Sequence, residues 1–163
     1  MSEENPPEPS VAPFKIWVDA DACPRPVKDV IFKASRRLSV PVTLVADRIM
    51  ATPQGYPLVK SISVVQGLDA ADDWIAQEVT AVDIVITADI PLAARIVESG
   101  AVGIDPRGEI YTEANVRERL SVRDFMHELR ETGVKTGGHG SYGNKEKQKF
   151  ANALDRILTK KLR

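Results

Sequence analysis

Short apolar runs rich in β-branched residues alternate with longer segments of helical period from Phe14 onward, and this alternation is the feature that most constrains the fold. It is typical of a parallel sheet whose strands are joined by crossover helices. Five runs have the length and composition of strands, namely 15–19, 42–46, 61–65, 83–87 and 101–105. The sequence therefore predicts an α/β fold with a central, mostly parallel five-stranded sheet.

Helix signals fall between and after these runs. Pro26 stands where a helix can begin, Gly100 where one can end, and Thr112 can cap the segment that follows it. The stretch from Ser121 to Asp124 resembles a capping box, which predicts the start of a separate helix. The predicted helices are 26–38, 69–79, 91–99, 113–120, 121–131 and 145–162.

The 163 residues fit one globular domain flanked by segments of different composition. Residues 1–13 hold four prolines and three glutamates with almost nothing to bury, so we expect a disordered leader. Residues 14–132 form the predicted α/β domain. Five of the ten glycines lie within 133–144, which predicts a mobile loop before a basic C-terminal helix at 145–163.

The composition excludes several classes of protein. A hydrophobic fraction of 43% with 28% charged residues is ordinary for a globular chain and excludes collagen, a coiled coil and wholesale disorder. Cys23 is the only cysteine, which excludes an internal disulfide and a cysteine-rich zinc site. No apolar run approaches the ~18 residues that a membrane helix needs. We therefore expect a cytoplasmic protein with no membrane partner.

The charge is divided unevenly along the chain. The net charge is −1, but the residues from Lys135 onward carry a net +6. A basic tail on an acidic body can approach a polyanion such as RNA, or it can fold back on the body. A solvated amphipathic helix with no partner explains the same charges, so the pattern alone leaves these alternatives open.

Acidic residues gather where the predicted strands end. Because ligands of an open parallel sheet bind outside the carboxyl ends of its strands, these acids are candidates for a common site. Like charges in one cleft repel each other unless a cation compensates them, and an oxygen-only ligand set favours Mg²⁺ or Mn²⁺. Such ions suit phosphate chemistry. The acids are Asp19, Asp21, Asp69, Asp72, Asp73, Asp89 and Asp105.

Each acid also has a structural explanation. Asp89 can be the N-cap of the helix that follows it, and Asp73 is favoured near the positive end of its own helix. Asp105 precedes Pro106 and is a good turn starter. Asp19 and Asp21 are the strongest metal candidates, because they end a hydrophobic strand directly and have no obvious capping role.

Four segments then carry a family resemblance: VDADACP, DAADDWI, VITADIPLAARIVESGA and DPRGEIYTEANVRERL, in that order. They resemble the bacterial YaiI/YqxD family, itself similar to PIN and NYN-type nuclease domains, and the resemblance covers about 14–162. It implies a three-layer PIN-like sandwich with strand order 3-2-1-4-5 and C-terminal helices. It also implies a metal-dependent nuclease whose catalytic and metal-binding acids are Asp19, Asp21, Asp73 and Asp89, with Asp72 as a rival of Asp73.

Cations near the strand ends are candidates for binding a substrate's phosphates. Arg25 and Lys28 begin the first crossover helix, and Arg48 follows the second strand. The leading hypothesis is a nuclease that uses Mg²⁺ or Mn²⁺ to activate water, with RNA as the expected substrate. Two alternatives stay open: a noncatalytic nucleic-acid-binding module, and a phosphatase of the haloacid dehalogenase type in which Asp19 would be phosphorylated.

Overall fold

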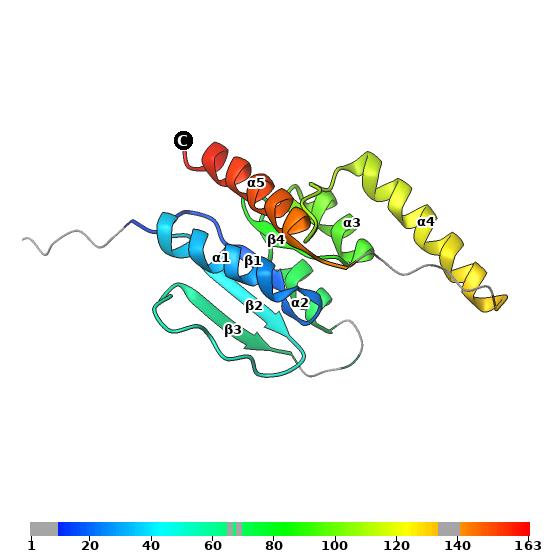
Figure 1. Cartoon of the computed structure of the whole chain (residues 1–163), viewed down its shortest axis with the longest axis horizontal. Coiled ribbons are helices and arrows are strands. Elements are labelled where there is room, and N and C mark those ends of the chain that lie inside the picture. Colours follow the sequence, from blue (N-terminus) through cyan, green and yellow to red (C-terminus); the bar gives the residue numbers. More distant parts are fainter. Residues whose placement is uncertain (1–9, 65–66, 68–69, 134–140) are drawn as a thin grey trace, which may run out of the picture.

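A computed structural model describes residues 10–64, 67, 70–133 and 141–163 (Figure 1). The predicted leader at 1–13 and the predicted loop at 133–144 therefore fall largely outside the described residues. Within the described residues, no helix is long and apolar enough to cross a membrane.

The sheet has the predicted number of strands and the predicted order. Its strands are β1 (Ile16–Asp19), β2 (Val42–Ala46), β3 (Val59–Ser63), β4 (Ile84–Ile86) and β5 (Val102–Ile104). All neighbouring strands pair in parallel, and their order is β3-β2-β1-β4-β5. The α/β fold with order 3-2-1-4-5 is thus confirmed, with the sheet fully parallel rather than mostly so.

Strand β3 begins two residues earlier than the sequence predicts. The turn before it closes with a hydrogen bond from the Val59 amide to the Tyr56 carbonyl, and Val59 then pairs with Val42 of β2. Val59 is buried at this first position, whereas Lys60 is exposed. The apolar residues after Ser63 had suggested a later strand.

Helices cover both faces of the sheet. Helices α1 (Arg25–Leu38) and α5 (Asn144–Lys161) bury their apolar residues with those of one face, including Val18 of β1. Helices α2 (Ala70–Glu78) and α3 (Ile90–Ser99) pack with Trp17, which points to the other face. The alternation of side chains along each strand places these residues on opposite faces and gives a three-layer sandwich.

Helix α4 corrects the prediction of two separate helices at 113–120 and 121–131. A single helix runs over Glu113–Glu131, with Thr112 and Asn115 forming the capping box at its start. Ser121 does not cap a new helix, because its hydroxyl donates to the Arg117 carbonyl four residues back. This back-bonding keeps Ser121 within a continuous helix. The first half of α4 packs beside α3, and its second half extends away from the sheet (Figure 1).

Helix α5 belongs to the hydrophobic core as well as to the basic tail. Phe150, Leu154 and Leu158 recur at a spacing of four residues and are fully buried against α1 and the sheet. Lys149 and Lys160 lie on the exposed face of the same helix. Helix α5 therefore packs against the body with these two cations facing solvent, whereas Lys161 Nζ donates to the Val82 carbonyl.

Candidate metal and phosphate site

The strand order places a crevice at the carboxyl ends of β1 and β4. Chain connections run outward from β1 through β2 to β3 in one direction, and from β4 to β5 in the other. Ligands of open parallel sheets bind at such a reversal. Val18 and Ile86 are the last residues that pair between β1 and β4. Asp19 and Thr87, which follow them, therefore meet at this crevice.

Asp19 is held at the crevice by a side chain from the neighbouring strand end. The Thr87 hydroxyl donates to Asp19 Oδ2 at 3.0 Å, and Thr87 Oγ1 in turn accepts from the Asp89 amide at 3.0 Å. Asp19 is only 8% exposed, and no cation among the described residues forms an ion pair with it. A buried carboxylate without a cation is costly.

The electrostatic surroundings of Asp19 disfavour its ionised form. Burial raises the pKa of Asp19 above its usual range, the hydrogen bond from Thr87 partly offsets this, and the nearby carboxylates of Asp89 and Asp21 raise it further. The structure therefore brings these three predicted acids within electrostatic range of one another. A bound cation would reverse the balance, since it stabilises every carboxylate that faces it.

Asp21 and Asp89 each give one oxygen to the backbone. Asp21 Oδ2 accepts from the Asp47 amide at 2.9 Å, which ties the short 3-10 turn after β1 to the connection after β2. Asp89 Oδ1 accepts from the Leu92 amide at 2.8 Å, so the interpretation of Asp89 as the N-cap of α3 is confirmed. The other carboxylate oxygen of each residue, Oδ1 of Asp21 and Oδ2 of Asp89, takes no part in these two hydrogen bonds.

Asp73 has a different partner from the other three acids. It forms an ion pair of 2.7 Å with Arg95 of α3, and both side chains are largely exposed. Asp72, its rival from the sequence, is half-buried, and Asp69 lies outside the described residues. In this arrangement Asp73 is paired with an arginine, a structural role that differs from the helix-end stabilisation expected from the sequence.

The acids do not form a closed cage for a metal. Among the described residues, no three His, Cys, Asp or Glu side chains stand close enough together to hold an ion. This arrangement still fits Mg²⁺, because Mg²⁺ keeps several waters and binds through one or two carboxylates together with substrate phosphates. Asp19 and Asp89 are the pair that the fold places best for this, and the ligand set contains only oxygen.

The predicted phosphate-binding cations lie around the same end of the sheet. Arg25 and Lys28 occupy the first turn of α1, and Arg48 follows β2. None of the three forms an ion pair with any residue that the structure describes. They are therefore available to an anionic ligand, whereas Arg95 is already paired with an aspartate.

Cys23 lies beside the acids but is poorly suited to be a nucleophile. It is buried, and burial raises the pKa of its thiol to about 12, a rise that Lys28 partly opposes and Asp19 increases. A thiol with this pKa is protonated at neutral pH and reacts slowly. A reaction in this crevice would therefore use its carboxylates and water rather than the Cys23 thiol.

A model of the family described as "Uncharacterized BCR, YaiI/YqxD family" matches residues 17–160, which include every residue of the crevice. The chain belongs to the YaiI/YqxD family.

Curated relatives of this YaiI/YqxD chain carry the description UPF0178 protein. The one from Trichlorobacter lovleyi is 56% identical over 148 residues, which cover 91% of this chain and 96% of the relative. The one from Geobacter sulfurreducens is 52% identical over 151 residues, which cover 92% and 99%. One from Shewanella sp. (strain MR-7) is 49% identical over 147 residues, which cover 90% and 96%. No solved structure matches the chain.

The sequence analysis of this YaiI/YqxD chain missed the part played by Thr87. Its hydroxyl links the ends of β1 and β4 by donating to Asp19 and accepting from the Asp89 amide. A signal was present, because a threonine two residues before an aspartate at a strand end can form a side-chain turn with that backbone amide. The resemblance implies that β1 and β4 are neighbours, but no local sequence signal shows that the Thr87 hydroxyl reaches Asp19, 68 residues away.

Proposed function

We propose that this protein is a metal-dependent phosphodiesterase that cleaves nucleic acid, with RNA as its substrate and Mg²⁺ or Mn²⁺ as its cofactor. The observation that carries the proposal is Asp19, a buried carboxylate that forms no ion pair with any described residue and is repelled by two neighbouring acids. A fold that served only structure would disperse such charges or pair them. A hard cation together with a phosphate diester satisfies the same arrangement.

Different side chains would bind the ion and the phosphates. Asp19 and Asp89 would hold the ion at the crevice, with Thr87 fixing the orientation of the Asp19 carboxylate. Arg25, Lys28 and Arg48 would attract the phosphates, since the first turn of α1 adds the positive end of a helix dipole to its own cations. When bound, the ion supplies an activated water and stabilises the leaving oxygen.

The absence of a closed ligand cage has a consequence for affinity. With only two well-placed carboxylates, the free protein would bind the ion weakly, and the substrate's phosphate would complete the coordination. Asp21 would join as a ligand only if its bond to the Asp47 amide were given up or shared. Asp73 would join only by leaving Arg95.

The resemblance of VDADACP and TADIPLA to the YaiI/YqxD family, itself similar to PIN domains, supports the same assignment. In that similarity Asp19, Asp73 and Asp89 match acidic positions of the nuclease domains, with Asp72 as a rival of Asp73, and Asp21 matches a polar position. The strand order 3-2-1-4-5 agrees with the order that the resemblance implies. The order by itself supports a ligand site at β1 and β4 but no particular reaction.

The proposal is tested by incubating the protein with a fluorescently labelled RNA of mixed sequence in EDTA, Mg²⁺ or Mn²⁺. We expect cleavage only with metal, and its loss in Asp19→Asn and Asp89→Asn. Asp124→Asn is the matched control, because it makes the same change on an exposed part of α4. Equal cleavage by Asp19→Asn and wild type would refute the proposal.

The two alternatives give different outcomes in the same experiments. A noncatalytic binding module would bind the RNA without cleaving it in the presence of either metal. Its affinity for the RNA would not depend on Asp19. A phosphatase of the haloacid dehalogenase type would form a beryllofluoride adduct on Asp19, since such enzymes pass through a phosphorylated aspartate. Detection of that adduct would replace the nuclease proposal.

A further inference from the structure

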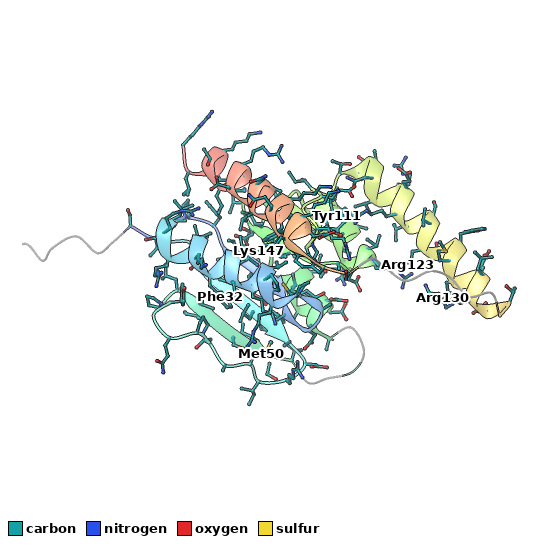
Figure 2. All side chains as sticks on the ribbon, viewed as in Figure 1. Phe32, Met50, Tyr111, Arg123, Arg130 and Lys147 are labelled. Carbon is teal, nitrogen blue, oxygen red and sulfur yellow. The ribbon has the colours of Figure 1, made fainter. Side chains whose placement is uncertain are left out.

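A hollow of about 480 Å³ lies between α1 and the connection from β2 to β3. We name it the α1 pocket and define it by six of its lining residues: Arg25, Lys28, Phe32, Lys33, Met50 and Tyr56. Phe32 on α1 and Met50 on the connection, both labelled in Figure 2, contribute to its lining. Its volume falls in the range of pockets that hold one small organic ligand.

Aromatic and apolar side chains form one wall of the α1 pocket. The rings of Phe32 and Tyr56 lie with their centroids 6.0 Å apart at an interplanar angle of 44°, and the Arg36 guanidinium lies 4.7 Å from the Tyr56 ring centroid. Both aromatic residues are only half-buried. Ile49, next to Met50, is 89% exposed, so apolar surface continues outside the pocket.

Positive charge dominates the other wall of the α1 pocket. Arg25, Lys28 and Lys33 line it together with a single carboxylate, that of Asp29. Within the described part of the chain, none of the three cations forms an ion pair. A pocket that combines half-buried rings with unpaired cations is complementary to a flat aromatic group that carries a phosphate.

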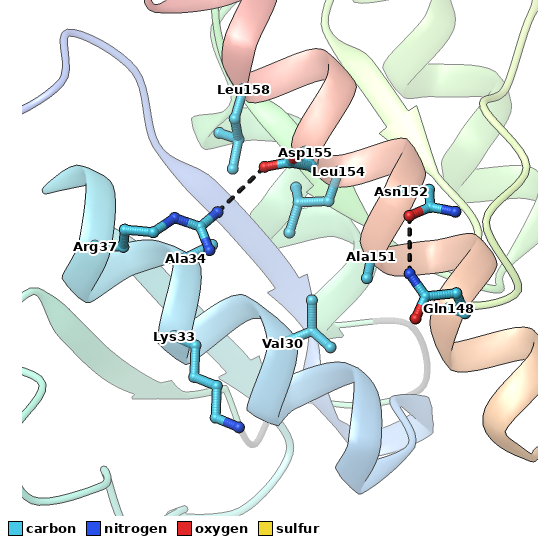
Figure 3. A pocket seen from close by; sticks show the side chains of 10 residues that line it. All are labelled: Val30, Lys33, Ala34, Arg37, Gln148, Ala151, Asn152, Leu154, Asp155 and Leu158. Carbon is cyan, nitrogen blue, oxygen red and sulfur yellow. Dashed lines mark hydrogen bonds and ion pairs between the residues drawn. The ribbon is translucent and has the colours of Figure 1, made fainter.

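A smaller hollow on the other side of α1 lacks these features. It has a volume of about 280 Å³ and lies between α1 and α5. It shares Lys33 with the α1 pocket, but Figure 3 shows that its other polar side chains pair with each other, Arg37 with Asp155 at 3.2 Å and Gln148 with Asn152 at 2.9 Å. Because these groups are already satisfied, this hollow has the character of a seam between helices.

The α1 pocket borders the acidic crevice. The Asp21 carboxylate accepts from the Asp47 amide at 2.9 Å, and this bond fixes the start of the connection that carries Met50 and Tyr56. Arg25 and Lys28, which line the pocket, lie in the first turn of α1, and Cys23 and Pro24 alone separate that helix from the 3-10 turn at Ala20–Ala22 that follows Asp19. A ligand in the pocket can therefore extend a phosphate toward Asp19.

We propose that the α1 pocket binds one unpaired base of a nucleic-acid strand stacked on the ring of Phe32, with the adjoining phosphates on Arg25 and Lys28. The proposal rests on the nuclease function proposed above and adds its substrate class. A base in a duplex is stacked and paired, so it can enter the pocket only after it is extruded, which costs free energy. The pocket therefore makes the protein selective for single strands.

The test measures binding in EDTA, which separates the pocket from catalysis. A fluorescein-labelled ten-nucleotide RNA of mixed sequence is titrated with the full chain, and anisotropy gives Kd for the single strand and for its duplex. We expect tighter binding of the single strand. Phe32→Leu should weaken it at least about fivefold, the lower end of what one base–aromatic stack contributes, and Arg25→Gln should reduce the log–log salt slope by about 0.7.

Helix α4 offers matched controls for both variants. Phe125→Leu and Arg123→Gln make the same changes at exposed positions far from the pocket (Figure 2), and we expect them to bind like wild type. Near-ultraviolet circular dichroism checks that Phe32→Leu is folded, and Phe32→Tyr, which retains a ring, should restore the affinity.

The outcomes separate this proposal from the nuclease function. If Phe32→Leu and Phe125→Leu bind equally, or if the duplex binds as well as the single strand, the pocket assignment is wrong, whatever the cleavage assay shows. If the variants behave as expected but no metal supports cleavage, the pocket stands and the nuclease function fails. Loss of cleavage in Asp19→Asn with unchanged affinity in Phe32→Leu would leave only the nuclease function.

Discussion

Asp83 and Asp19 are both buried aspartates at strand ends, but they lie at opposite ends of the sheet. Asp83 precedes β4 at the amino end and is 4% exposed, whereas Asp19 ends β1 at the carboxyl end and is 8% exposed. Three donors surround Asp83: the Lys15 amide, the Trp17 indole N–H and the Thr80 amide, at 2.9 to 3.0 Å. Within the part of the chain that the structure describes, the side chain of Asp19 receives one hydrogen bond, from the Thr87 hydroxyl.

The comparison shows that burial alone does not separate a structural aspartate from a functional one. A buried carboxylate with several N–H donors is satisfied by the protein and needs nothing further. A carboxylate with one donor and two repelling neighbours is stabilised by a ligand that the fold does not contain. The number and charge of their partners therefore make Asp19, rather than Asp83, the candidate for binding a ligand.

The largest effect is expected for Asp83→Ala. This change leaves the Trp17 indole N–H without its partner in the core and removes an acceptor from the Lys15 and Thr80 amides. An unsatisfied buried group costs about 1–3 kcal/mol, so we expect the free energy of unfolding to fall by about 3 kcal/mol. Urea denaturation measures this, and a loss below 1 kcal/mol would contradict the structural role of Asp83.

Asp105→Ala tests whether partners or position decide the role of an aspartate. Asp105 lies at the same end of the sheet as Asp19 but accepts from Arg119 Nη1 at 3.0 Å and from the Tyr111 hydroxyl at 3.3 Å. Arg119 keeps Glu109 as a partner, and the Tyr111 hydroxyl keeps the Thr87 carbonyl. We therefore expect a smaller loss of about 1–2 kcal/mol in urea denaturation. If Asp105→Ala were instead more stable than wild type, the position of an aspartate at this end of the sheet, and not its partners, would decide its role.

Much of the fold could be predicted from the sequence. The strands are apolar and β-branched, and the helices carry local start and stop signals such as Thr112 and Gly100. These signals act over a few residues, so they can be recognised in the sequence without knowledge of the tertiary structure. The break predicted at Ser121 failed because the same hydroxyl can cap a helix or bond back within one, and the sequence does not distinguish these uses.

The site could be predicted in part. Asp19, Asp21 and Asp89 were identifiable because strand ends of a parallel sheet share one edge. The pairing of Asp73 with Arg95 joins two helices across the fold, and the meeting of Phe32 with Tyr56 joins a helix to a distant connection. Neither has a local sequence signal. The hydrogen bond between Asp83 and the Trp17 indole has no local sequence signal either, because the two residues are 66 positions apart.

Asp19→Asn is expected to act in the opposite direction to the two changes above. Asparagine can still accept the Thr87 hydrogen bond and removes a charge that Asp21 and Asp89 repel. Without metal, we expect the free energy of unfolding to stay the same or rise by less than about 1 kcal/mol. With Mn²⁺, wild type should gain stability in thermal denaturation and the variant should not. A destabilisation as large as that of Asp83→Ala would assign Asp19 a structural role.

The smallest effect is the pH dependence of that difference in stability. Because the pKa of Asp19 is raised on folding, the folded state holds its proton at pH values where the unfolded state has lost it. The resulting stabilisation of wild type is fully present below the ordinary pKa of 3.8 and is lost as the pH rises through the folded value. Asp19→Asn has no such proton, so its stability relative to wild type should increase with pH over this window. Urea denaturation of both proteins in EDTA between about pH 3.5 and 7 measures the trend, with Asp124→Asn as the control. A relative stability that falls as the pH rises would show that the folded protein favours the Asp19 carboxylate, which would remove the distinction between Asp19 and Asp83.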